Sequence, residues 1–186
     1  SSKKTLTSIQ NTIKKWCKMD NSNTGGEDRR ARTQKEVKQI ITERNHVFSL
    51  YCELAKFPSF HMDDNNEQDA ALDLLQEFCQ TLIDYIASGQ FEIYQRLIDG
   101  EERRSELLTL AENTYPKISE ITTIAVNFND KYDCARLNMN DSELLQNLPN
   151  DLSVLGEALA NRTEMEDEMI NALLGDNFSI ATAASA

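Results

Sequence analysis

Cysteine, histidine and carboxylate side chains are the groups in this chain that could bind metals or carry out catalysis. The four cysteines lie 27 to 55 residues apart without a C-x-x-C pair, and neither histidine stands at ligand spacing from one of them. They therefore form no zinc motif and predict reduced thiols, most of them packed as small apolar core residues. These residues are Cys17, Cys52, Cys79, Cys134, His46 and His61.

The carboxylates also lack the spacing of a metal or catalytic site. Residues 63–69 alternate acidic and polar side chains as a calcium loop does, but Gln68 and Leu74 stand where that loop needs glycine and a bidentate glutamate. We interpret these acids as the start of a helix. Paired Glu-x-x-His motifs, phosphate loops and nucleophile elbows are absent. We therefore expect a binding protein without metal or cofactor, not an enzyme.

Apolar residues recur at helical spacing along most of the chain, which contains only 6 glycines and 3 prolines. We expect Pro58 and Pro149 to end helices, Pro116 to start one, and Gly89 and Gly175 to follow helix C-termini. The fold class predicted is all-α, a single-domain helical bundle of four long helices plus several short ones. The ranges expected to be helical are 5–19, 33–57, 68–87, 91–98, 102–113, 116–133, 142–148 and 151–174.

Composition divides the chain into three parts. Residues 1–30 form a basic amphipathic arm with a linker at Gly25-Gly26, residues 31–175 form the bundle, and residues 176–186 form a disordered tail rich in alanine and serine. The alternative for the arm is an ordinary first helix that packs on the bundle. No apolar run is long enough for a membrane span or a leader, so we expect a soluble cytoplasmic protein.

The net charge of −12 is unevenly distributed. Residues 1–44 contain 11 of the 19 lysines and arginines but only 5 of the 31 acids. The acidic remainder repels phosphates, which argues against direct binding of DNA or RNA, and it attracts a basic partner instead. The alternative is that this charge only maintains solubility.

One face of the helix expected at 68–87 forms an acidic stripe. Its residues step by three or four and lead towards Phe91 beyond the glycine, and they are Asp73, Glu77, Gln80, Asp84 and Ala87. Phe91 is alternatively a core residue of the next short helix, and Asp84 a solvated or capping residue. We interpret Arg162 and Glu166 as a helix-surface ion pair worth a few tenths of a kcal/mol.

Several longer motifs resemble one known family. They are YCELA at 51–55, the run from Glu77 to Tyr94, FND at 128–130 followed by DC at 133–134, and LGEAL at 155–159 followed by Arg162, Glu166 and Asp167. In consistent order over residues 36–174, they are similar to the Rsd/AlgQ family of bacterial anti-sigma regulators, and to its AlgQ branch in particular.

The resemblance implies a helical bundle that binds region 4 of the primary sigma factor as a monomer. Such binding masks the contacts of region 4 with the −35 element and with core RNA polymerase, and so favours alternative sigma factors in stationary phase. Asp84, Ala87 and Phe91 match family positions implicated in sigma contact, with Ser88, Gln90 and Tyr94 beside them. Asp73 and Glu77 then form an acidic stripe that steers the partner. The alternative function is an adaptor for another protein, such as a phosphotransfer carrier or an alarmone enzyme.

Overall fold

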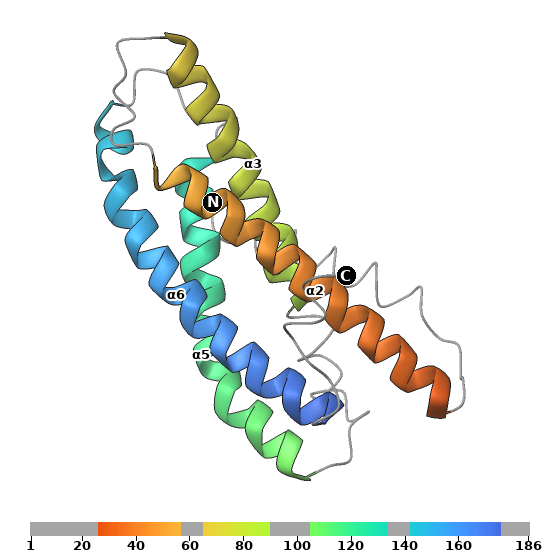
Figure 1. The fold of residues 1–186 in the computed structure, drawn as a ribbon. Coiled ribbons are helices and arrows are strands. Elements are labelled where there is room, and N and C mark those ends of the chain that lie inside the picture. Colours follow the sequence, from red (N-terminus) through yellow and green to blue (C-terminus); the bar gives the residue numbers. More distant parts are fainter. Residues whose placement is uncertain (1–25, 57–64, 90–104, 134–141, 176–186) are drawn as a thin grey trace.

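The computed structural model describes residues 26–56, 65–89, 105–133 and 142–175. Within these ranges the chain forms four long helices and no strand: α2 (Gly26–Leu54), α3 (Asn65–Gly89), α5 (Ser105–Tyr132) and α6 (Ser142–Leu174). The helices lie side by side in an elongated bundle (Figure 1). The predicted all-α class and single helical domain are confirmed.

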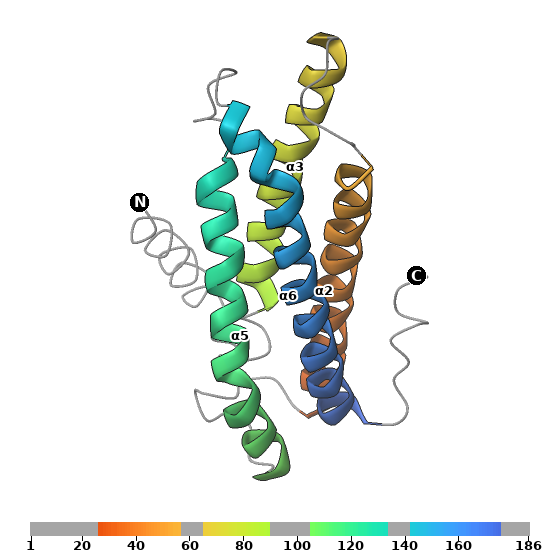
Figure 2. The same ribbon diagram turned by 90° about the vertical axis from the view of Figure 1, so that its left-hand side faces the viewer.

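Consecutive helices run antiparallel and pack as two pairs (Figure 2). The most extensive contacts join α2 to α3 and α5 to α6, while α3 and α5 pack together and connect the pairs. The interface between α2 and α6 is the least extensive of these four.

Aromatic and aliphatic side chains from all four helices form one core. The ring of Phe78 lies 6.2 Å from that of Tyr51 and meets the ring of Phe128 edge-on at 5.9 Å. Helix α3 buries one apolar face, with Leu75, Phe78, Leu82 and Ile86 in the core, whereas Cys52 of α2, one of the cysteines expected to be mostly core residues, and Ala55 directly after α2 are exposed. The buried face of α2 passes instead through Leu50, directly before the YCELA motif, and Leu54 within it.

Two prolines lie inside helices, which overturns the expected helix boundaries. Pro116 is within α5 and Pro149 within α6, so the helices expected at 102–113 and 116–133 are one helix, as are those at 142–148 and 151–174. Each proline removes one backbone donor. The flanking turns on both sides bury apolar residues in the same core, and this packing outweighs the local preference. The buried neighbours are Ala111, Ile118, Leu145, Leu148 and Leu152.

The other helix ends follow the sequence more closely. Helix α3 ends at Gly89, and α6 ends before Gly175, whose φ of 72° lies in the left-handed region that glycine adopts without strain. Helix α2 begins at Gly26, earlier than the expected Thr33. The helices expected at 5–19 and 91–98, most of the arm and the tail lie outside the described residues.

At Gly156, the side chain of Tyr51 on α2 packs directly against the backbone of α6. The hydroxyl of Tyr51 donates a hydrogen bond to the backbone carbonyl of Leu152 at 2.9 Å. A Cβ atom at position 156 would lie 2.2 Å from that hydroxyl oxygen. Glycine is therefore required here for the tyrosine to reach the backbone of α6.

None of the described helices combines the length and the apolar character that crossing a bilayer requires.

Candidate functional site

The acidic stripe predicted on α3 lies on the surface. Asp73, Glu77, Gln80 and Asp84 are all exposed and follow one face of the helix for three turns. The side-chain amide of Gln80 donates to Asp84 Oδ1 at 3.1 Å. Glu77 Oε1 lies 3.8 Å from Nε2 of His46 on α2, an ion pair only when the histidine is protonated. This face thus presents carboxylates to an approaching cation.

A groove of about 470 Å³ runs beside this stripe, between α3 and α5. Its rims are carboxylates from both helices, with Asp73 and Glu77 on α3 and Asp133 at the end of α5. The thiol of Cys79 donates to the carbonyl of Tyr132 at 3.8 Å, which joins the two walls at the floor. Its other described lining residues are Gln76, Gln80, Thr81, Ile83 and Asn129, and none of the described lining residues is a lysine or arginine.

The end of α3 carries the next predicted contact residues. Ala87 and Ser88 are half-buried, and the hydroxyl of Ser88 donates to Glu43 Oε2 of α2 and lies 3.3 Å from the carbonyl of Tyr85. Ser88 thus ties the end of α3 to α2. Gln90, Phe91 and Tyr94 lie outside the described residues.

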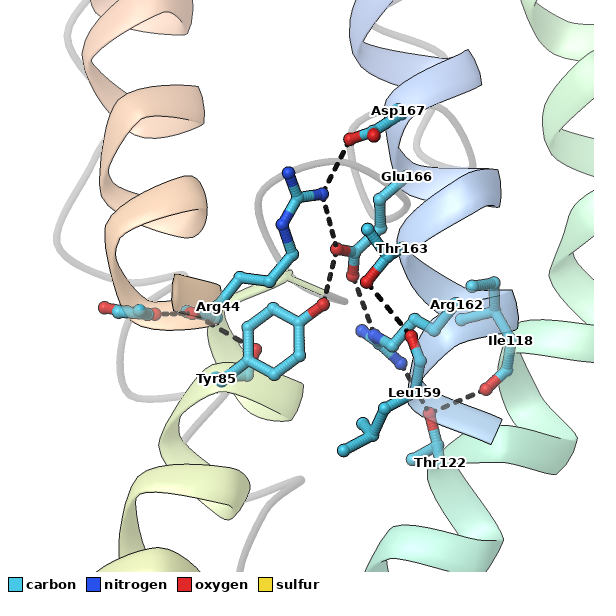
Figure 3. A network of polar contacts seen from close by, with 11 residues as sticks. Arg44, Tyr85, Ile118, Thr122, Leu159, Arg162, Thr163, Glu166 and Asp167 are labelled. Carbon is cyan, nitrogen blue, oxygen red and sulfur yellow. Dashed lines mark hydrogen bonds and ion pairs between the residues drawn. The ribbon is translucent and has the colours of Figure 1, made fainter. Parts of the chain in front are cut away.

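Behind the end of α3, the bundle contains a buried polar network (Figure 3). Arg162 Nε donates to Glu166 Oε1 at 2.7 Å, and both side chains are 0% exposed. The hydroxyl of Tyr85 donates to the other oxygen, Glu166 Oε2, at 2.6 Å. Arg44 Nη1 lies 2.6 Å from Asp167 Oδ1 and 3.9 Å from Glu166 Oε2. Two guanidinium groups and two carboxylates therefore balance in charge; Arg44, Arg162 and Glu166 are buried, and Asp167 is half-exposed at the edge of the network.

The interpretation of Arg162 and Glu166 as a surface ion pair is wrong. Both residues fall on the apolar stripe of α6, whose other members are Leu155, Leu159 and Met169. Helical spacing assigns both positions to the core, so the sequence does indicate that these two charges are buried. Such a charge persists when paired and hydrogen-bonded, and here Arg162 Nη1 also reaches the hydroxyl of Thr122 on α5 at 3.3 Å.

Burial dominates the titration of Tyr85. It raises the pKa of the phenol well above its usual value, and the negative charge and hydrogen bond of Glu166 raise it further. The positive charges of Arg162 and Arg44 oppose this shift but do not outweigh it. Tyr85 therefore stays a hydrogen-bond donor to Glu166 throughout the neutral range.

The last turn of α3 packs against the network. A Cβ atom at Gly89 would lie 3.2 Å from Arg162 Nη2 and 3.3 Å from Glu166 Oε1. The last turn of α3 is therefore packed directly on the buried ion pair. The hydrogen bond from Tyr85 to Glu166 also holds this turn in place.

A second polar cluster lies where α5 ends near α6. Asp151 Oδ2 accepts from Lys131 Nζ at 2.5 Å and from the Tyr132 hydroxyl at 2.6 Å. Burial favours the neutral form of Asp151, but these hydrogen bonds and the charge of Lys131 outweigh it and lower the pKa of the carboxyl. Burial and the bond to Asp151 raise the pKa of Tyr132. Water reaches the charged side chains of this cluster, since Lys131 and Asp151 are 39% and 34% exposed, whereas the Arg162–Glu166 pair of the network is 0% exposed.

The thiols divide between surface and core. Cys52 is exposed, contrary to the expected core position, whereas Cys79 is buried as predicted. Cys17 and Cys134 lie outside the described residues. Nowhere in the described ranges do three or more side chains gather in a way that could hold a metal ion.

The chain matches known proteins over most of its length. Residues 5–174 match the family described as "Regulator of RNA polymerase sigma(70) subunit, Rsd/AlgQ", a range that extends N-terminally beyond the motifs at 36–174. Three relatives are each named "Regulator of sigma D". Those from an Enterobacter species and from Yersinia enterocolitica are 36% and 34% identical over 55% and 52% of this chain. The third, from Salmonella newport, is 29% identical over 74% of this chain and 81% of its own length.

In those first two comparisons this chain spans 60% and 56% of the relatives' own length. No solved structure matches the chain. The match over residues 5–174 covers more than half of the sequence and includes all four described helices. The chain belongs to the Rsd/AlgQ family of regulators of the RNA polymerase sigma(70) subunit.

Proposed function

We propose that this protein is an anti-sigma transcription regulator that binds the primary sigma factor of RNA polymerase. Its family is described as regulators of the sigma(70) subunit, and the three relatives carry the name "Regulator of sigma D". A regulator that acts on RNA polymerase works in the cytoplasm. It acts by protein contact and without an enzymatic step.

The observation that carries the proposal is the exposed acidic stripe on α3. Region 4 of a primary sigma factor is a basic helix-turn-helix module, and a row of carboxylates is complementary to it. We place region 4 along Asp73 and Glu77 and over the end of α3. The proposed contact residues are Asp84, Ala87, Ser88, Gln90, Phe91 and Tyr94.

Binding in this position acts by exclusion. Region 4 uses its basic surface to read the −35 element and another surface to dock on core polymerase, and a bound bundle masks both. Sigma factors that do not bind the bundle then gain access to core polymerase. We propose a complex with one copy of this chain per sigma factor and no direct contact between this chain and nucleic acid.

Titration of the intact protein with isolated region 4 tests the proposal. Asp73→Lys combined with Glu77→Lys should slow association at least tenfold at low salt, because the steering charges are reversed. Glu157→Lys combined with Glu164→Lys makes the same charge change on exposed positions of α6 and should have a much smaller effect. For the unmodified protein, the association rate should fall as salt rises. Absence of binding to region 4 would contradict the proposal and favour another protein partner.

A further inference from the structure

We propose that the groove between α3 and α5 receives a basic helix of the sigma partner, so that α5 supplies half of the binding surface through Asn129 and Asp133. The inference rests on the proposed function and extends it to a second helix. It also assigns a role to the FND and DC motifs at 128–134, which the acidic stripe alone leaves without one.

The groove has walls that are fixed by the core. Phe78 and Tyr132 are both fully buried, and Phe78 packs edge-on against Phe128 directly behind the groove. At the floor of the groove, the thiol of Cys79 donates a hydrogen bond to the backbone carbonyl of Tyr132. A surface held by such packing does not need to reorganise when a partner binds, which favours affinity.

The charge of the lining matches one class of occupant. Carboxylates stand on both rims, namely Asp73 and Glu77 on one side and Asp133 on the other, and none of the described residues that line the groove is a lysine or arginine. An arginine or lysine that enters between the rims meets acids from two directions, and a guanidinium can bond a carboxylate with two parallel hydrogen bonds. The amides of Gln76, Gln80 and Asn129 add donors and acceptors, and Ile83 adds an apolar contact.

The positions of Asn129 and Asp133 support a role at this surface. Asn129 lies in the last turn of α5 and Asp133 directly follows the helix, and both are half-buried and line the groove. Phe128, the first residue of the same motif, is buried in the core. One short motif thus anchors α5 inside the bundle and also lines the groove.

The experiment measures the affinity of the intact protein for isolated region 4 in two matched pairs of variants. Asp133→Lys reverses a rim charge, and Glu120→Lys makes the same change at an exposed site about 20 Å further along α5. Thr81→Phe fills the groove without changing the charge, and Thr123→Phe adds the same bulk at an exposed site on α5. Asp133→Lys and Thr81→Phe should each weaken binding at least tenfold, and the two controls less than twofold. Circular dichroism melting verifies that each variant is folded.

Three outcomes overturn the inference, and they can be told apart. If the unmodified protein binds region 4 but Asp133→Lys and Thr81→Phe behave like their controls, the groove is not part of the binding site for region 4. The proposed function then stands. If the unmodified protein does not bind region 4, the proposed function fails and the inference fails with it. If Asp133→Lys strengthens binding, the occupant of the groove is the chain's own basic segment 1–25. Should Asp133→Lys not fold, Thr81→Phe decides alone.

Discussion

Two ion pairs in this protein share one sequence spacing but lie in opposite environments. Arg32 and Glu36 are four residues apart on α2, with side chains 34% and 20% exposed and a separation of 3.2 Å. Arg162 and Glu166 have the same spacing on α6, yet both are 0% exposed and lie 2.7 Å apart. The spacing of two opposite charges predicts that they meet. The face of the helix on which they fall decides how much the ion pair contributes to the stability of the protein.

The difference arises from what surrounds each pair. Arg32 and Glu36 precede Val37, the first core residue of α2, so water reaches them. Glu166 instead accepts from Arg162 and from Tyr85, and Arg44 stands 3.9 Å away. When a buried charge loses one such partner, water cannot replace the lost hydrogen bond or ion pair.

The largest effect is expected from removing the charge of one buried partner. Glu166→Gln keeps the volume of the side chain but leaves Arg162 as a buried charge without its counter-ion. We expect the free energy of unfolding to fall by about 3–5 kcal/mol. Glu36→Gln should change it by about 0.5 kcal/mol or less. Urea denaturation measures both values, and a loss below about 1 kcal/mol for Glu166→Gln would show that water reaches the network.

A smaller effect separates the two tyrosine–carboxylate hydrogen bonds. The Tyr85 bond to Glu166 and the Tyr132 bond to Asp151 are both 2.6 Å long. Tyr85→Phe should lower the free energy of unfolding by about 1.5–3 kcal/mol, since the acceptor is a buried ion. Tyr132→Phe should have a smaller effect, because Lys131 and water still solvate Asp151. Equal losses in denaturant titrations of the two variants would contradict this distinction.

The smallest effect is a pH dependence at the exposed cluster. The folded protein lowers the pKa of Asp151, so its stabilising contribution is present above the pKa of the unfolded chain, about 3.9, and is lost as pH falls through the folded value. Asp151→Asn should therefore destabilise the protein modestly at pH 7, and the difference from the unmodified protein should shrink below about pH 4. Thermal unfolding across this range measures the difference. A difference that grows towards low pH would show that the sign is wrong.

Helical periodicity was sufficient to predict the class of the fold and the exposed stripe on α3. It placed Asp73, Glu77 and Asp84 on one face, and each is exposed. It was insufficient at Pro116 and Pro149, because packing of the flanking turns outweighs a local preference that is visible in the sequence.

The groove and the network could not be predicted because they join residues far apart in the chain. Asp73 and Asp133 come from two helices whose adjacency depends on the packing of Phe78 against Phe128. The buried ion pair was nevertheless within reach, since Arg162 and Glu166 occupy positions of the apolar stripe. A rule that treats charges on a core face as buried partners would have found them.

The contact between Tyr51 and Gly156 restricts how this sequence can change. Any side chain at position 156 collides with the tyrosine ring, whose Cζ atom would lie 2.7 Å from a new Cβ. Alanine is otherwise favoured over glycine within a helix by about 1 kcal/mol. Alanine at position 156 can stabilise the helix only if Tyr51 is first replaced by a residue without a ring. That replacement by itself removes the hydrogen bond from Tyr51 to Leu152. The two positions can therefore improve only together, and each single substitution passes through a less stable protein.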